Sequence, residues 1–240
     1  MRDIALQLYS VADACGQDFI GTLRRVRDMG YTAVEFAGYP LPPEEMKRTL
    51  EEIGLKPVSS HGNIGNIDAE IDYLTKVGTN HIVLPAYRFE SYEHTMESAK
   101  WLEDVGKKLF EHGIALSYHN HTEEFQRDEK TGKRYMDLFL ENCDPKYVKM
   151  QPDMAWVTRG GEDLVAFVER YKDRILFVHA KDITAAEGAL CAVGSGCVKT
   201  LEALSIVPHA QIVVEQDGPL DDKKWADLEK SVAFLRKNLD

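Results

Sequence analysis

The chain has 240 residues, of which 44% are hydrophobic and 29% are charged, and its mean hydropathy is −0.34. These values are typical of a globular protein with a sizeable core. The formal net charge is −11 and lysine and arginine form no cluster, which argues against nucleic acid as a partner. No apolar stretch approaches the roughly 20 residues of a membrane helix, so we expect no membrane partner and a cytoplasmic protein.

The cysteines and the chain length narrow the fold classes further. Cys15, Cys143, Cys191 and Cys197 form no Cys-x-x-Cys pair, so we expect free thiols rather than a zinc or redox motif. A length of 240 residues suits one barrel domain over residues 1–240, because such folds commonly have about 250 residues.

The first half of the chain alternates short apolar runs with charged amphipathic segments. A glycine separates each segment from the run that follows, at Gly30, Gly54, Gly78 and Gly113. Glycine tolerates the left-handed conformation at a helix end, so each segment is predicted to be a helix. The predicted strands are Ile4 to Tyr9, Thr32 to Phe36, Pro57 to His61, His81 to Leu84 and Ile114 to His119.

The second half continues the same alternation. Its predicted strands are Tyr147 to Met150, Ile175 to Lys181 and Gln211 to Glu215, and its predicted helices are Glu162 to Tyr171, Thr200 to Leu204 and Asp222 to Leu235. Eight strands that alternate with helices predict parallel pairing and favour closure into an α/β (β/α)₈ TIM barrel. A doubly wound open sheet is the alternative, but the first strand lacks the Gly-rich phosphate turn usual in such sheets.

Polar side chains collect at the carboxyl ends of six predicted strands. These ends carry Glu35, His61, His119 with His121, Asp153, His179 with Lys181, and Glu215. In a barrel of this type the carboxyl ends of the strands form the mouth that holds the active site. Carboxylates together with imidazoles suit one divalent ion such as Mn²⁺, Mg²⁺, Co²⁺ or Zn²⁺.

Several stretches resemble one known family. They are Tyr118 to Phe125, Asp153 to Val157 with Gly160-Gly161, His179 to Asp182, Val193 to Gly196, and Val214 to Asp217. Their order and spacing resemble the xylose isomerase-like barrel proteins described as sugar phosphate isomerases/epimerases, in the branch with Tyr-His-Asn-His on strand five. The resemblance covers nearly the whole chain.

The resemblance implies a set of metal ligands. Relatives that epimerise ketoses hold the metal with Glu, Asp, His and Glu on strands five to eight. This chain matches three of these ligands with Asp153, His179 and Glu215, and His119 takes the place of the strand-five glutamate. That replacement removes one of two carboxylates that such epimerases use as paired proton carriers. Trp156 stands where many relatives have a substrate-contacting histidine, and it can instead wall the pocket or stack on a sugar.

The remaining candidates have alternative interpretations. Glu215 is the first candidate for the catalytic base, and the candidates for the partner acid are Glu124, His61 and Lys181. The candidates for substrate binding are Glu35, His61, His121, Trp156 and Lys181. Glu35 and His61 can instead make local hydrogen bonds, His121 can bind the metal or orient His119, and Glu124 can be solvated. Asp153, His179 and Glu215 can also form a structural ion network, and the other four histidines are assigned no chemistry.

The leading hypothesis is a sugar isomerase or epimerase that transfers a proton next to a carbonyl through an enediolate. The alternative enzyme is a lyase or dehydratase acting on a keto-sugar or inosose. A non-catalytic carbohydrate-binding barrel and a phosphodiesterase like endonuclease IV are further alternatives, the latter disfavoured by the acidic chain. The sequence leaves the oligomeric state open, although barrels of this kind often form homo-oligomers.

Overall fold

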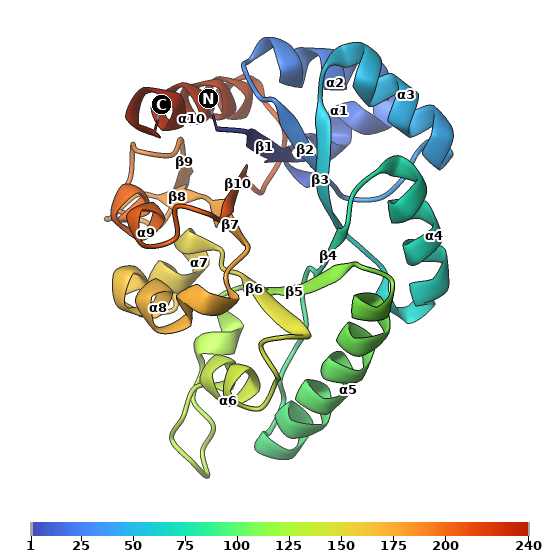
Figure 1. The fold of residues 1–240 in the computed structure, drawn as a ribbon. Helices are drawn as coiled ribbons and strands as arrows, with labels where there is room; N and C mark the ends of the chain where they lie inside the picture. Colours follow the sequence, from blue (N-terminus) through green and yellow to red (C-terminus); the bar gives the residue numbers. More distant parts are fainter. Residues whose placement is uncertain (1, 240) are drawn as a thin grey trace.

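A computed structural model describes residues 2–239 of the chain. Eight parallel strands form a nearly closed barrel with helices around it (Figure 1). The barrel strands are β1 (Ile4–Gln7), β2 (Ala33–Phe36), β3 (Lys56–His61), β4 (His81–Leu84), β5 (Ala115–His119), β6 (Val148–Gln151), β7 (Phe177–Ala180) and β10 (Gln211–Val214). They are hydrogen-bonded in the order β6-β5-β4-β3-β2-β1-β10-β7. The prediction of an α/β TIM barrel is confirmed.

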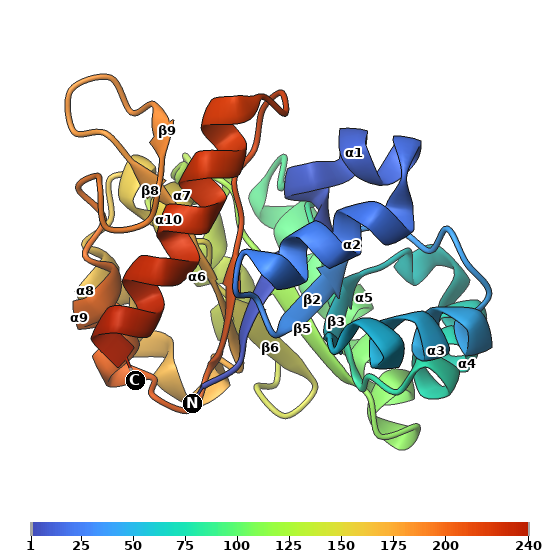
Figure 2. The same ribbon diagram turned by 90° about the horizontal axis from the view of Figure 1, so that it is seen from above.

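The helices cover the outside of the barrel. They are α1 (Ala12–Gln17), α2 (Phe19–Asp28), α3 (Pro43–Ile53), α4 (Ile67–Val77), α5 (Tyr92–Glu111), α6 (Tyr135–Glu141), α7 (Met154–Arg159), α8 (Leu164–Tyr171), α9 (Thr200–Ile206) and α10 (Asp222–Leu239). Short 3₁₀ helices lie at Leu8–Val11, Ile64–Asn66, Glu123–Phe125 and Lys172–Arg174. In Figure 2 the two ends of the chain lie close together, beside the last turn of α10. Among residues 2–239, no helix has the length and apolar character needed to cross a membrane.

The glycine pattern has the predicted effect on the helix ends. Gly54 and Gly78 cap α3 and α4 in the left-handed conformation, with φ of 80° and 93°. A side chain at either position would be strained, since other L-residues rarely adopt these angles. The four cysteines are free thiols, as predicted.

Several strand bounds differ from the prediction by one or two residues, and the carboxyl ends of β1 and β7 are among them. β1 stops at Gln7 because its side chain caps the 3₁₀ helix Leu8–Val11 by accepting a hydrogen bond from the backbone N–H of Tyr9. β7 stops at Ala180, and the chain then forms a small antiparallel hairpin, β8 (Asp182–Ile183) with β9 (Leu190–Cys191). Both differences lie at the mouth of the barrel, where loops replace regular structure.

The inside of the barrel is layered. Ala5, Ala33 and Val213 form a small apolar cluster, with Phe177 packed against it. Alternate residues of a strand share a face, so the residues two positions further along these four strands also point into the barrel. They are Gln7, Glu35, Glu215 and His179, all buried. The fold thus stacks a polar layer on an apolar one at the end of the barrel where the site lies.

Candidate metal centre

Four side chains from four neighbouring strand ends meet in the polar layer. One possible ligand atom from each of His119, Asp153, His179 and Glu215 lies within 4.8 Å of the others, and all four residues are buried. These are the four ligands that the resemblance implied. His61 forms a second such group with His119 and His179. The structure therefore contains a buried group that could hold a metal.

The two carboxylate oxygens of Asp153 have different roles: one accepts a hydrogen bond from the backbone, and the other points to the cluster. It caps the N-terminus of α7, and its Oδ1 accepts a hydrogen bond from the backbone N–H of Trp156 at 2.9 Å. Its Oδ2 lies 2.9 Å from the Lys181 ammonium but accepts no well-directed hydrogen bond. Burial raises the pKa of Asp153, an effect that the charge of Lys181 opposes. A buried carboxylate oxygen that is held only by an ion pair with Lys181 fits a metal ligand.

His119 is also incompletely satisfied. Its Nδ1 is buried and has no hydrogen-bond partner among the described residues. Leaving such an atom unpaired typically costs about 1–3 kcal/mol. Burial, helped by the nearby His179 and His61, lowers the pKa of His119 well below its usual value. His119 is therefore a neutral imidazole with an unused nitrogen, which is the form that binds metals.

His179 lies between two carboxylates. Its Nδ1 is 2.9 Å from Glu215 Oε2 and its Nε2 is 2.6 Å from Glu35 Oε1. Although burial opposes a charge on the ring, the two carboxylates raise the pKa of His179 to about 10. Burial alone would raise the pKa of Glu215, but Lys181 and His179 hold it well below its usual value. Metal binding at Nδ1 requires the loss of one proton from this imidazolium.

Lys181 neutralises the carboxylates of the cluster. Its Nζ lies 2.9 Å from Asp153 Oδ2, 2.8 Å from Glu215 Oε2 and 2.5 Å from Asp217 Oδ2. The side chain is buried, which by itself favours the neutral amine, yet these three carboxylates raise its pKa well above the ordinary value. The structure places this predicted substrate contact behind the carboxylates, and it does not line the cavity described next.

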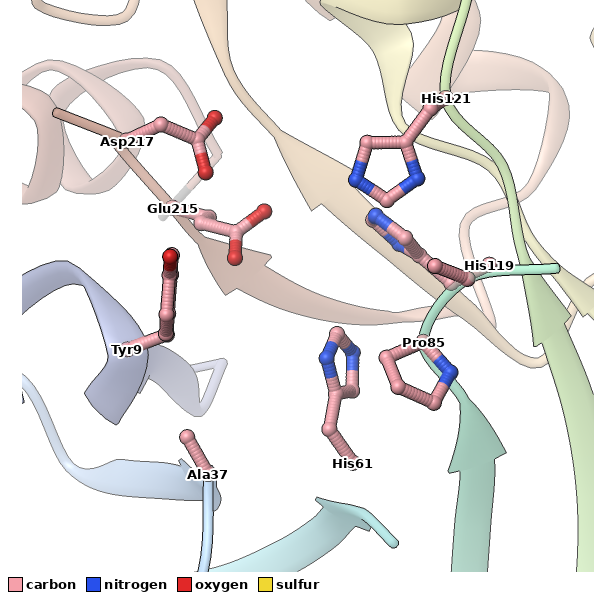
Figure 3. Close-up of a pocket in the computed structure, with 9 residues that line it drawn as sticks. Tyr9, Ala37, His61, Pro85, His119, His121, Glu215 and Asp217 are labelled. Carbon is pink, nitrogen blue, oxygen red and sulfur yellow. The ribbon is translucent and has the colours of Figure 1, made fainter. Parts of the chain in front are cut away.

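A cavity of about 380 Å³ opens directly onto the cluster (Figure 3). Small-molecule sites typically have about 300–1,000 Å³, so this volume suits a compact substrate. In Figure 3, Glu215 and Asp217 face His61, His119 and His121 across the space. The full lining is Tyr9, Ala37, His61, Pro85, Ala86, His119, His121, Glu215 and Asp217.

Three other predicted residues lie around rather than on this cavity. Glu35 is completely buried beneath it. Glu124 is buried too, and its carboxylate accepts hydrogen bonds from the Tyr118 hydroxyl at 2.7 Å and from the backbone N–H of His121 at 3.0 Å. Trp156 is half-buried, with its ring 6.4 Å from that of His121 and with its Nε1 unpaired. Glu124 thus holds the segment that carries His121.

Among the lining residues that were not predicted, two have polar side chains, Asp217 and Tyr9. Asp217 belongs to the run Glu215-Gln216-Asp217, in which strand-like alternation would have placed it on the same side as Glu215. Tyr9 was included in the first strand and gave no separate signal. It is 57% exposed, and it reaches the cavity because the chain leaves the strand at Leu8.

The nearly closed α/β barrel and the buried His, Asp and Glu cluster at its mouth define the class of protein, a TIM barrel with a candidate metal centre. The chain belongs to the xylose isomerase-like TIM barrel family, whose sequence profile matches residues 23–238.

Two curated proteins with similar sequences are a rhizopine catabolism protein and an inosose dehydratase. The rhizopine catabolism protein MocC of Rhizobium meliloti is 26% identical over 191 residues, which are 67% of this chain and 56% of that protein. Inosose dehydratase of Mesomycoplasma hyopneumoniae strain 7448 is 33% identical over 124 residues, which are 52% of this chain and 38% of that protein. The chain thus spans only about half the length of these curated relatives, or less.

A solved structure matches the fold over nearly its whole length. It is a sugar phosphate isomerase/epimerase from Parabacteroides distasonis ATCC 8503, with a TM-score of 0.86 and 25% identity, covering 98% of this chain and 93% of that one. The family and its structural neighbours are enzymes.

Proposed function

We propose that this chain is a metal-dependent isomerase or epimerase of a small polyhydroxy carbonyl compound, which transfers a proton at the carbon next to the carbonyl. The observation that carries the proposal is the position of Glu215, which belongs to the candidate metal cluster and also lines the cavity. His119, Asp153, His179 and Glu215 would hold the ion. When bound, a divalent ion supplies a Lewis acid that makes the neighbouring C–H more acidic.

Glu215 is the proposed base. Its Oε2 is held by His179 at 2.9 Å and by Lys181 at 2.8 Å, which leaves Oε1 as the oxygen available to a substrate proton. Against the effect of burial, Lys181 and His179 lower the pKa of Glu215, so its carboxylate is ionised.

His61 is the proposed partner acid. Of the three candidates predicted for this role, His61 alone lines the cavity, whereas Lys181 and Glu124 are buried behind other groups. Its Nε2 lies 3.1 Å from Gln151 Oε1, a contact that fixes the ring. Return of a proton to the same carbon from the other face gives an epimer. Return to the neighbouring carbon gives an isomer.

A panel of ketoses and aldoses incubated in heavy water with the metal-loaded protein tests this proposal. NMR should show one deuterium at the carbon next to the carbonyl, together with an epimer or isomer of the substrate. Glu215→Gln should lower turnover by about 10²–10⁴-fold, the usual contribution of a positioned acid or base. Glu70→Gln is the matched control, because Glu70 is a buried carboxylate that contacts Tyr39 and Asn63 outside the cluster. Full turnover of a metal-loaded Glu215→Gln protein would refute the assignment.

Dehydration is a second candidate, and a specific observation favours it. The chain has His119 at the strand-five position of the cluster, so a second carboxylate does not face Glu215 there. The similarity to inosose dehydratase points the same way. In this reaction Glu215 removes the C–H proton, the C–O bond of the next carbon breaks, a C=C bond forms, and His61 gives a proton to the departing hydroxyl. A product lighter than the substrate by one water, detected by mass spectrometry, would identify this outcome.

A further inference from the structure

Glu35 is a buried carboxylate that reaches the candidate metal centre from below. We propose that Glu35 is a positioning residue, which holds the His179 ring so that Nδ1, and not Nε2, is the metal-binding atom. This inference rests on the metal centre of the proposed function. It replaces the expected substrate contact, because Glu35 has no exposed surface and does not line the cavity.

The protein itself supplies the hydrogen-bond donors that surround Glu35. Its Oε1 accepts from Gln7 Nε2 at 2.8 Å and from His179 Nε2 at 2.6 Å. Its Oε2 accepts from Ser59 Oγ at 2.6 Å and from Gln151 Nε2 at 2.7 Å. His61 Nε2 lies a further 3.2 Å from Oε1. An ionised carboxylate has about four acceptor sites, so these five neighbouring groups use its whole capacity. Glu35 therefore has no acceptor site left for a substrate.

The two glutamines are locked in the orientation that makes them donors to Glu35. The other end of the Gln7 amide accepts a hydrogen bond from the backbone N–H of Tyr9 at 3.0 Å. The Gln151 oxygen lies 3.1 Å from His61 Nε2. Each amide therefore turns its NH₂ group towards Glu35. If Glu35 were replaced by glutamine, the new NH₂ group would face at least one of these donors, and two donors cannot form a hydrogen bond with each other.

The consequence for His179 follows from the chemistry of imidazole. A ring that donates Nε2–H to Glu35 has its lone pair on Nδ1 once it is neutral. Nδ1 is the nitrogen on the side of Glu215, at 2.9 Å from its Oε2, and hence on the side of the cluster. Carboxylates that accept the second N–H of a metal-binding histidine fix its tautomer and strengthen it as a ligand.

Titration of the chelator-treated protein with Co²⁺, followed by calorimetry, tests the role of Glu35 without any substrate. Glu35→Gln should weaken Co²⁺ binding about 10–100-fold, as is typical when such a partner is removed. Glu70→Gln should bind Co²⁺ like the wild type, because the Glu70 carboxylate accepts its hydrogen bonds from Tyr39 and from the backbone N–H of Asn63, and neither is one of the four proposed ligands. Unchanged affinity in Glu35→Gln would overturn this inference alone. No Co²⁺ binding by the wild type would overturn the metal centre as well.

A second measurement uses only the wild-type protein, so it stands even if Glu35→Gln fails to fold. In cadmium-loaded protein, NMR couplings between the metal and the ring protons of His179 reveal the bonded nitrogen. Bonding through Nδ1 couples cadmium to Hε1 only, whereas bonding through Nε2 couples it to both Hε1 and Hδ2. The proposal requires the first pattern for His179, and the second pattern would overturn it.

Discussion

Asp153 and His179 face each other across the seam that closes the barrel. They form an isolated parallel bridge, and the backbone N–H of His179 donates to Pro152 O at 2.9 Å. Apart from this contact, β6 and β7 share only the bridge between Met150 and Ile175. The other neighbouring strands of the barrel pair through ladders of two to four residue pairs, with one register shift between β2 and β3. Two proposed ligands thus sit on opposite sides of the least regular junction in the sheet.

We therefore expect metal binding to stabilise the whole fold. At a free metal concentration about 100 times Kd, the free energy of unfolding should rise by about 2.7 kcal/mol. Urea unfolding of chelator-treated protein with and without Mn²⁺ measures this change. Asp153→Asn should remove most of the increase. An equal increase in that variant would mean that the ion binds elsewhere.

His119 should contribute to metal binding while weakening the metal-free fold. Its buried Nδ1 has no partner, so replacing the ring with an apolar side chain removes an unsatisfied group. His119→Leu should leave the stability of the metal-free protein unchanged or raise it, and should abolish the increase caused by Mn²⁺. The same unfolding experiment measures both effects. A large loss of stability in the metal-free variant would show that His119 is mainly a structural residue.

Lys181 should contribute more to the stability of the metal-free protein than to that of the metal-loaded protein. Lys181→Met leaves three carboxylates without their ammonium partner, and breaking a buried pair in this way typically costs about 3–5 kcal/mol. A bound divalent ion would neutralise part of the same negative charge, so Mn²⁺ should reduce the loss. Lys108→Met is the control, because the ion pair of Lys108 with Asp68 lies on the surface and contributes at most about 1 kcal/mol. An identical loss with and without Mn²⁺ would contradict this account.

His81 should make stability depend on pH below neutrality. Burial lowers its pKa from 6.5 to about 4, and Glu35 only partly opposes this effect. The unfolded chain therefore binds a proton at higher pH than the folded one. The stabilising contribution is full above pH 6.5 and is lost as the pH falls from 6.5 towards about 4.

A variant separates this effect from those of other groups. His81→Gln retains a partner for the Ser117 hydroxyl, which lies 2.9 Å from His81 Nε2, but glutamine does not titrate. Between about pH 7 and about pH 5.5 the wild type should lose roughly 1 kcal/mol more stability than the variant. Urea unfolding at the two pH values gives the difference. Parallel losses in the two proteins would refute the assignment.

The local sequence predicts the strands and the polar residues at their ends, because these depend on alternation and turn signals, whereas the family resemblance singled out the four residues that cluster. His81–Leu84 matches its predicted bounds, and the cluster joins the ends of successive strands. The hydrogen-bond partners of Glu35 could not be predicted from the sequence. Its contact with His179 spans 144 positions of the chain, and no local pattern indicates that several donors converge on one carboxylate. The burial of Lys181 behind Glu215 and Asp217 depends on similar long-range packing.

A crystal structure of the protein soaked with Mn²⁺, with data collected at the manganese absorption edge, would show directly whether the four clustered side chains bind a metal. We predict one strong anomalous peak at the mouth of the barrel, within bonding distance of His119, Asp153, His179 and Glu215. A saturated crystal that shows no peak among these four side chains, or a peak bound only by other residues, would contradict this prediction.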